Sequence, residues 1–158
     1  MKELIEATRS VATTAHDSLT LIQRPWLGGI GTIKTGSDNA DFSVRVKNYG
    51  PVPAVRVGLQ MNRFPMAEFR SKIGGLCNEA KRSMAHGRYI FPGEADYYPL
   101  GHRFVTVSVG APVDATQIYG GCIAYLGEFN DFHHTEFCFV REASGQGVIP
   151  CTVEQKAD

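Results

Sequence analysis

Cysteine, histidine and acidic residues gather in one stretch, GCIAYLGEFNDFHHTEFC, which runs from Gly121 to Cys138. Cys122 and Cys138 bracket two adjacent histidines and three carboxylates. Thiolates, imidazoles and carboxylates bind metals, and a thiol beside a base is a nucleophile. Two thiols can also form a disulfide, and a β-hairpin can simply contain such residues. The backbone that carries them decides between these four chemistries.

The alternation of residue types in this stretch predicts a β-hairpin. Its strands would cover Ile118–Leu126 and His134–Arg141, with the loop centred near Asn130. The predicted cross-strand pairs are Cys122 with Cys138, Tyr125 with Thr135, and Leu126 with His134. One face of the hairpin is apolar and is expected to face the core, with Ile123, Tyr125, Phe137 and Phe139. The opposite face carries Cys122, Ala124, His134, Glu136 and Cys138.

Strand geometry weighs against a metal centre. His134 and Cys138 lie four residues apart on one strand, which separates them by about 13 Å at about 3.3 Å per residue. A single zinc ion holds its ligands at about 2.0–2.3 Å. The candidate metal ligands Cys122, His134 and Cys138 therefore do not converge on a straight strand, and we expect no metal or other cofactor.

The two cysteines of the hairpin have two further interpretations. Cross-strand neighbours place their Cβ atoms about 4.5–5.5 Å apart, whereas a disulfide needs about 3.8 Å. A bond between Cys122 and Cys138 would therefore be strained, and an oxidising compartment would be required for it. The favoured interpretation is two buried thiols packed under another element.

Nucleophilic catalysis is disfavoured for the same stretch. Cys122 or Cys138 with His134 and Glu136 supplies the right residue types. No glycine-rich elbow, helix N-terminus or known catalytic motif accompanies them. His133 is expected to be solvent-exposed, and Tyr125 with Thr135 is expected to form a structural pair of hydroxyl groups. The sequence does not favour an enzyme.

Composition describes an ordinary globular chain. It has 158 residues, of which 43% are hydrophobic and 20% charged, and its sixteen basic residues balance its sixteen acidic ones. The basic stretch NEAKRSMAHGR is interpreted as a solvated helix face, so we expect no nucleic-acid binding. No signal peptide or membrane-spanning run is visible, and four cysteines are few for a disulfide scaffold. We expect reduced thiols and a cytoplasmic or membrane-tethered location rather than secretion.

Helical periodicity is confined to two segments. Residues 1–24 are predicted to form an N-terminal helix and linker, ended by Pro25, with an apolar stripe of Leu4, Val11, Ala15, Leu19 and Ile22. This helix could dock on the domain or serve as a stalk for self-association. A second, short helix is predicted within Met66–Met84, with Gly74 and Gly75 breaking it.

Residues 25–154 are predicted to form one domain of β-strands. Phe42, Val44 and Val46 alternate with polar residues, and so do the apolar residues of the next strand, Val55, Val57, Leu59 and Met61. Further strands are predicted at Gly29–Lys34, Arg88–Phe91, Ala95–Tyr98, Arg103–Val109 and Gly147–Val153. The fold class is therefore all-β, an immunoglobulin-like antiparallel β-sandwich of about seven to nine strands with an N-terminal α-helix and one short inserted helix.

Two short motifs are expected to hold the domain together. Asn48 and Gly50 form the turn between the two alternating strands. Trp26, the only tryptophan, is expected to cap one end of the core, and Arg24 to bond carboxylates or helix-end carbonyls. The alternative places Arg24 and Trp26 at the headgroup level of a membrane.

The segment FSVRVKNYGPVPAVRVGLQM resembles the region between the second and third strands of CARDB-like, immunoglobulin-like bacterial sandwich domains. In those domains an alternating strand precedes an Asn-x-Gly turn and a small residue that opens the next strand. The corresponding residues here are Asn48, Gly50 and Ala54. IFPGEADYY resembles the turn before a later strand of the same domains, at Pro92, Gly93 and Glu94. The resemblance implies a fold and says little about function.

A second resemblance runs through RPWLG, KNYGPVPA, IFPGE and YGGCIAY…HHTEFC, in that order. These motifs are similar to those of a recurring uncharacterised bacterial protein type, in which a membrane segment and an alanine-rich helix precede a small all-β domain. This likeness implies the soluble part of a membrane-associated protein, tethered only through a segment that this chain lacks, or a free-standing relative. We therefore expect a non-enzymatic binding or scaffolding module that self-associates or binds a protein partner. The alternative is a small enzyme or metal-binding protein centred on Cys122, His134 and Cys138.

Overall fold

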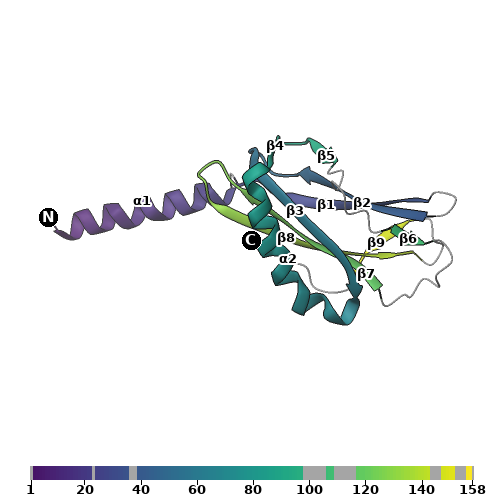
Figure 1. Ribbon diagram of the computed structural model, residues 1–158. Coiled ribbons are helices and arrows are strands. Elements are labelled where there is room, and N and C mark those ends of the chain that lie inside the picture. Colours follow the sequence, from purple (N-terminus) through teal and green to yellow (C-terminus); the bar gives the residue numbers. More distant parts are fainter. Residues whose placement is uncertain are drawn as a thin grey trace.

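The computed structural model describes residues 2–22, 24–35, 39–97, 106–108, 117–142, 147–151 and 156–157. Within these ranges the chain is mostly β, with two antiparallel sheets and two α-helices (Figure 1). The helices are α1 (Lys2–Ile22) and α2 (Phe69–Ser83), and short 3-10 turns flank α2. The strands are β1 (Leu27–Thr35), β2 (Asn39–Asn48), β3 (Ala54–Pro65), β4 (Arg88–Ile90), β5 (Ala95–Tyr97), β6 (Thr106–Ser108), β7 (Gln117–Leu126), β8 (Phe132–Arg141) and β9 (Val148–Pro150).

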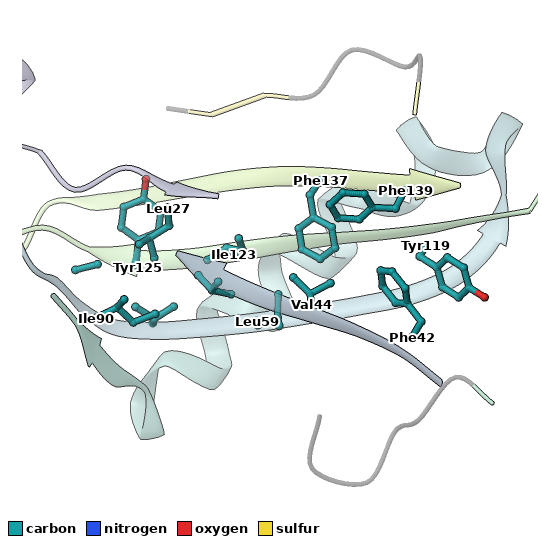
Figure 2. Close-up of a cluster of buried hydrophobic side chains, with 13 residues drawn as sticks. Leu27, Phe42, Val44, Leu59, Ile90, Tyr119, Ile123, Tyr125, Phe137 and Phe139 are labelled. Carbon is teal, nitrogen blue, oxygen red and sulfur yellow. The ribbon is translucent and has the colours of Figure 1, made fainter. Parts of the chain in front are cut away.

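One sheet has the order β1-β2-β5, with β6 also paired to β2, and the other has the order β4-β3-β7-β8-β9. The two sheets pack face to face, because period-two alternation gives each an apolar inner face. Figure 2 shows the shared core between them. Its members come from both sheets, among them Phe42, Val44 and Val46 from β2, and Leu59, Ile123, Tyr125 and Phe137 from β3, β7 and β8.

Tyr119 closes one end of this core. Its ring stacks on Phe42 with a centroid distance of 4.1 Å, and the residue is 5% exposed. Burial raises the pKa of the Tyr119 phenol above its usual value, although the guanidinium groups of Arg63 and Arg141 act in the opposite direction. The phenol is therefore neutral at neutral pH and behaves as a core aromatic.

Helix α2 covers the outer face of the five-stranded sheet. Its buried residues Phe69, Ile73 and Ala80 follow one another at helical spacing, and they form a second apolar cluster with side chains from β3, β7 and β8. Helix and strand meet most closely at Gly58 of β3, where a Cβ atom would clash with the carbonyl oxygen of Ala80. The inserted helix thus gives this sheet a second buried face.

Helix α1 projects away from the sheets as a separate rod (Figure 1). Each of its side chains that the structure describes, at residues 5–15, 17 and 18, is exposed. Among them are two large apolar residues, Ile5 at 62% and Val11 at 70% exposure. The described part of the helix therefore does not dock on the domain.

Asn48 joins three parts of the fold although it is a completely buried polar residue. Its side-chain oxygen accepts hydrogen bonds from the backbone nitrogens of Gly50, at 2.9 Å, and Trp26, at 3.4 Å. Its side-chain nitrogen donates to the carbonyl oxygens of Val52, at 2.7 Å, and Ile90, at 3.0 Å. One amide therefore satisfies the start of β1, the turn after β2 and the end of β4.

The backbone of Asn48 adds the Pro-Gly-Glu turn to this junction. Its nitrogen donates to the carbonyl of Glu94 at 3.1 Å, and its carbonyl accepts from Gly93 at 3.0 Å. Gly50 is required beside it, because a Cβ atom there would lie 2.6 Å from the Arg24 oxygen and the Trp26 nitrogen. The turn motifs singled out in the sequence are thus parts of one hydrogen-bonded unit.

Most elements predicted from the sequence are confirmed: the N-terminal helix, the alternating strand β2, and strands at each predicted position that the structure describes. Residues 98, 103–105, 109 and 152–153 of the predicted strands lie outside the described residues, and Gly147 and Cys151 flank β9 without belonging to it. Two details of the predictions were wrong. First, strict alternation placed Val55 on the core face of β3 together with Val57. Instead, an irregularity at Arg56, whose φ is 51°, turns Ala54 and Val57 to the core and leaves Val55 half-buried. Second, Gly74 and Gly75 do not break α2, which continues through them.

Replacement of Asn48 by alanine should lower the free energy of unfolding by roughly 3 kcal/mol or more, because buried backbone groups lose their partners at about 1–3 kcal/mol each. Urea unfolding followed by circular dichroism measures the change. The control is Asn62→Ala, since Asn62 is exposed and bonds only its neighbour Arg63 among the contacts seen here. Equal effects of the two variants would contradict the role assigned to Asn48.

Two glycine-to-alanine changes should have opposite signs. Gly75 has open space around its Cβ position inside a helix, so Gly75→Ala should stabilise the protein by about 0.5–1 kcal/mol. Gly58→Ala should destabilise it by about 1–3 kcal/mol, because α2 must move away from β3. Thermal unfolding of both variants tests the packing, and a stable Gly58→Ala protein would show that helix and sheet are not in contact there.

Candidate functional site

The hairpin of the Cys-His-rich stretch forms as predicted, but its register differs. Strands β7 and β8 pair Cys122 with Glu136, Ala124 with His134, and Gly120 with Cys138. The loop covers Gly127–Asp131, where Asn130 has a positive φ of 63° and the Gly127 nitrogen donates to the Asp131 carbonyl at 2.8 Å. This loop is centred one residue earlier than predicted, which moves each pair by two residues.

A shift by two residues leaves both faces of a strand unchanged. Ile123, Tyr125, Phe137 and Phe139 therefore belong to the core between the sheets, as predicted. Cys122, Ala124 and Cys138 lie on the opposite face, under α2. The sequence thus identified the faces of the hairpin correctly and its pairs wrongly.

All four cysteines are in disulfides, and neither bond joins Cys122 to Cys138, the disulfide that the sequence analysis considered and did not favour. Cys77 of α2 is bonded to Cys122 of β7, with their Cα atoms 5.0 Å apart. Cys138 of β8 is bonded to Cys151, which follows β9, with Cα atoms 5.3 Å apart. Cys138 lies opposite Gly120 and not opposite Cys122, so the predicted pair is too far apart. The expectation of reduced thiols was likewise wrong.

One bond joins two layers of the fold, and the other lies within a single sheet. Cys77–Cys122 ties α2 to the centre of the five-stranded sheet, and Cys138–Cys151 ties the last described strand to β8. Both lie in the apolar cluster beneath α2. Neither sulfur pair leaves a thiol for nucleophilic chemistry.

A group of potential metal ligands surrounds one of the disulfides. The side-chain ligand atoms of Cys77, His134 and Glu136 all lie within 4.8 Å of one another. His134 and Glu136 are two residues apart on β8, so both point toward α2. Arg70 of α2 forms an ion pair with Glu136 at 3.3 Å. Of the candidate ligands Cys122, His134 and Cys138, only His134 belongs to this group. Cys138 is bonded to Cys151 instead.

The neighbouring histidine has a different environment. His133 is buried, at 9% exposure, contrary to prediction, because it faces the inner end of the core and pairs with the Asp131 carboxylate. Its ring packs against Tyr125 at 5.6 Å between centroids. The predicted Tyr125–Thr135 pair does not form: the Tyr125 hydroxyl donates to the Pro25 carbonyl at 3.4 Å, and Thr135 lies opposite Ile123.

Aromatic side chains are exposed at the end of the domain that carries α1. Trp26 is 40% exposed and Tyr49 is 60% exposed, and the Tyr49 nitrogen donates to the Trp26 carbonyl at 2.8 Å. The guanidinium of Arg24 lies 3.6 Å from the Trp26 ring centroid, and the Lys47 ammonium lies 5.2 Å from that of Tyr49. Trp26 therefore does not cap the core as predicted, and Arg24 is engaged with an aromatic ring. The buried residues at this position are its neighbours Pro25 and Leu27.

Comparison with protein families, with curated proteins and with solved structures gives no match. Neither α1 nor α2 is long and apolar enough to cross a membrane, among the residues that the structure describes.

Sequence reasoning missed the part of the site that α2 contributes. Cys77 continues the apolar stripe of Phe69, Ile73 and Ala80 at four- and three-residue spacing. That spacing is a usable signal, because a cysteine in the buried stripe of a helix must meet the surface which the helix covers. The partner strand could not be read from the spacing.

Removing either disulfide should destabilise the protein, and the longer loop should matter more. Chain-entropy arguments give about 4 kcal/mol for Cys77–Cys122, which are 45 residues apart, and about 3 kcal/mol for Cys138–Cys151, which are 13 apart. Urea unfolding of the two double serine variants tests the order. Peptide mapping without reductant tests the pairing, and a Cys122–Cys138 peptide would overturn it.

Proposed function

We propose that this chain is a non-enzymatic binding or scaffolding module with immunoglobulin-like topology. The strand order supports the topology: β1-β2-β5 corresponds to strands A, B and E of such domains, and β4-β3-β7-β8 to strands C′, C, F and G. Helix α2 is then an insertion between C and C′. The hydrogen-bonded unit at Asn48, which unites the two motifs of the CARDB-like resemblance, also supports this relationship.

The state of the reactive side chains supports a role other than catalysis. All four thiols are bonded, His133 pairs with Asp131, and Glu136 pairs with Arg70. A nucleophile with a base and an orienting third group is not assembled in the part of the chain that the structure describes. Sandwich folds carry binding surfaces on their loops and edges, so a binding role fits the architecture.

The observation that carries the proposal is the isolation of α1. A 21-residue helix whose described side chains are all exposed is marginal in water, and this one contains several residues of low helix propensity. Its exposed apolar side chains supply the missing stabilisation once they are covered by a partner. A shallow hollow on its surface is lined by Ile5, Thr8, Arg9 and Ala12. We infer that α1 pairs with α1 of a second copy of the chain.

The sequence of α1 contains a seam suited to such pairing. Ile5, Ala12 and Leu19 are seven residues apart, and so are Thr8, Ala15 and Ile22, which lie three residues after them. This set of six residues, here called the α1 seam, forms one stripe of alternating three- and four-residue steps. Its small members allow close approach of two helices.

The exposed aromatic end supports a tethered module. Trp26, which follows α1 in the chain, and Tyr49, which is hydrogen-bonded to it, each lie beside a cationic side chain. A third such contact places the Lys81 ammonium 4.5 Å from the ring centroid of Phe132. Aromatic and basic side chains of this kind are enriched where a protein meets the headgroups of a membrane. Disulfides persist in oxidising compartments, and this chain has two. We therefore propose that the domain lies on the extracytoplasmic side of a bacterial membrane and not in the cytoplasm.

A matched pair of substitutions tests self-association. Thr8 belongs to the α1 seam, whereas Thr13 is exposed on the opposite face of the helix. Thr8→Asp should dissociate the oligomer, because it buries a charge in the pairing surface, and Thr13→Asp should leave it intact. Sedimentation or light scattering gives the mass. The same mass for both variants and for a protein lacking residues 1–23 would refute the proposal.

A further inference from the structure

The Cys77–Cys122 disulfide lies among side chains that would bind a metal if its sulfurs were free. Cys77 comes from α2, and His134 and Glu136 come from β8, and their ligand atoms lie within 4.8 Å of one another. Cys122 is bonded to Cys77 and is directly opposite Glu136 in the strand register. One sulfur, one imidazole and one carboxylate therefore converge on the outer face of the five-stranded sheet, and the Cys122 sulfur is bonded to the first of them.

We propose that reduction of Cys77–Cys122 creates a binding site for Zn²⁺ or a similar divalent ion, with Cys77, Cys122, His134 and Glu136 as ligands. Structural zinc sites are tetrahedral and take thiolate, imidazole and carboxylate ligands at about 2.0–2.3 Å. Such bond lengths put neighbouring ligand atoms about 3.3–3.8 Å apart. From a spacing within 4.8 Å, movements of about 1 Å bring Cys77, His134 and Glu136 around one ion. Cys122 joins them by rotating its side chain once its bond to Cys77 is broken.

The charges of the surroundings complement such a site. Two thiolates and the Glu136 carboxylate carry three negative charges, which the dication and the guanidinium of Arg70 together balance. Arg70 already lies 3.3 Å from Glu136, so its positive charge is in place beside the proposed ligands. The sulfurs lie in the apolar cluster under α2, which strengthens ligand bonds by excluding water.

Opening the site requires a reductant, and the structure indicates where it acts. Cys77 is partly exposed whereas Cys122 is fully buried. A thiolate of a dithiol reductant attacks the Cys77 sulfur, the S–S bond breaks, and Cys122 leaves as a thiolate. The second thiol of the reductant then displaces Cys77 and closes its own disulfide. Two electrons and two protons pass to the protein, and metal binding releases the protons of both thiols to solvent.

The second disulfide provides an internal control. Cys138 lies on the same face of β8 but is bonded to Cys151, and it is four residues from His134. It is opposite Gly120 in the strand register, so neither its cross-strand neighbour nor its disulfide partner Cys151 supplies an imidazole or a carboxylate. Reduction of Cys138–Cys151 should therefore create no site. This inference is independent of the pairing of α1, which lies outside the cluster.

Anaerobic titration of the full chain with Co²⁺ tests the proposal, because thiolate ligands give intense charge-transfer absorption. After dithiol reduction and desalting, the wild-type protein and Cys138→Ser/Cys151→Ser should each bind one Co²⁺, which Zn²⁺ displaces. The oxidised protein and Cys77→Ser/Cys122→Ser should show no such band. His134→Ala should weaken binding at least about tenfold.

Circular dichroism on each reduced sample separates ligand loss from unfolding. A folded Cys77→Ser/Cys122→Ser protein that retains the band would overturn the assignment, as would equal affinity in the oxidised and reduced states. Binding that is insensitive to His134→Ala and to Glu136→Gln would show an unstructured dithiol and not this site. The expected result is that the reduced protein keeps its β-sheet circular dichroism and binds one Co²⁺ through thiolates. His134→Ala should weaken this binding without loss of the β-sheet signal.

Discussion

The buried amide of Asn48 is the constraint on which the rest of the domain depends. It has no access to solvent, so each of its hydrogen-bonding groups must find a protein partner. Those partners are backbone groups from the start of β1, the turn before β3, and the end of β4. Because these segments belong to both sheets, the amide fixes how the sheets meet at the end from which α1 departs. The local turn chemistry and the global packing therefore specify the same arrangement.

The sequence was most informative where one periodicity held. Alternation in β2, β7 and β8 identified which side chains face the core, because the side-chain period of a strand depends on nothing outside it. The pairing of β7 with β8 depended on the five residues of the loop, where Asn130 adopts a left-handed conformation that no apolar pattern reports. Moving the loop centre by one residue, which shifts the register by two, was enough to replace the predicted Cys122–Cys138 neighbours by Cys122 and Glu136.

Long-range contacts account for what the sequence could not provide. Helix α2 was expected, but the strand that it covers is set by tertiary packing at Gly58, so the partner of Cys77 was not visible. Trp26 was expected inside because large aromatic residues are usually buried. Instead, the adjacent residues Pro25 and Leu27 are the buried ones. Trp26 is partly exposed, and the guanidinium of Arg24 stacks on its ring. The candidate site thus combines a strand face that could be predicted with a helix position that could not.

The last described residues of the chain return to β8. The Glu136 nitrogen donates to the Lys156 carbonyl at 2.7 Å, Thr135 bridges to Ala157, and β9 pairs with the other end of the same strand. At the opposite margin of this sheet lies β4, which has only three residues. An unpaired edge strand can pair with a strand of another chain, and repeated pairing of this kind leads to open-ended aggregation. Among the described pairings, β4 covers only Ala54–Val57 of the 12-residue strand β3, so the rest of β3 is the edge at which another chain would extend this sheet.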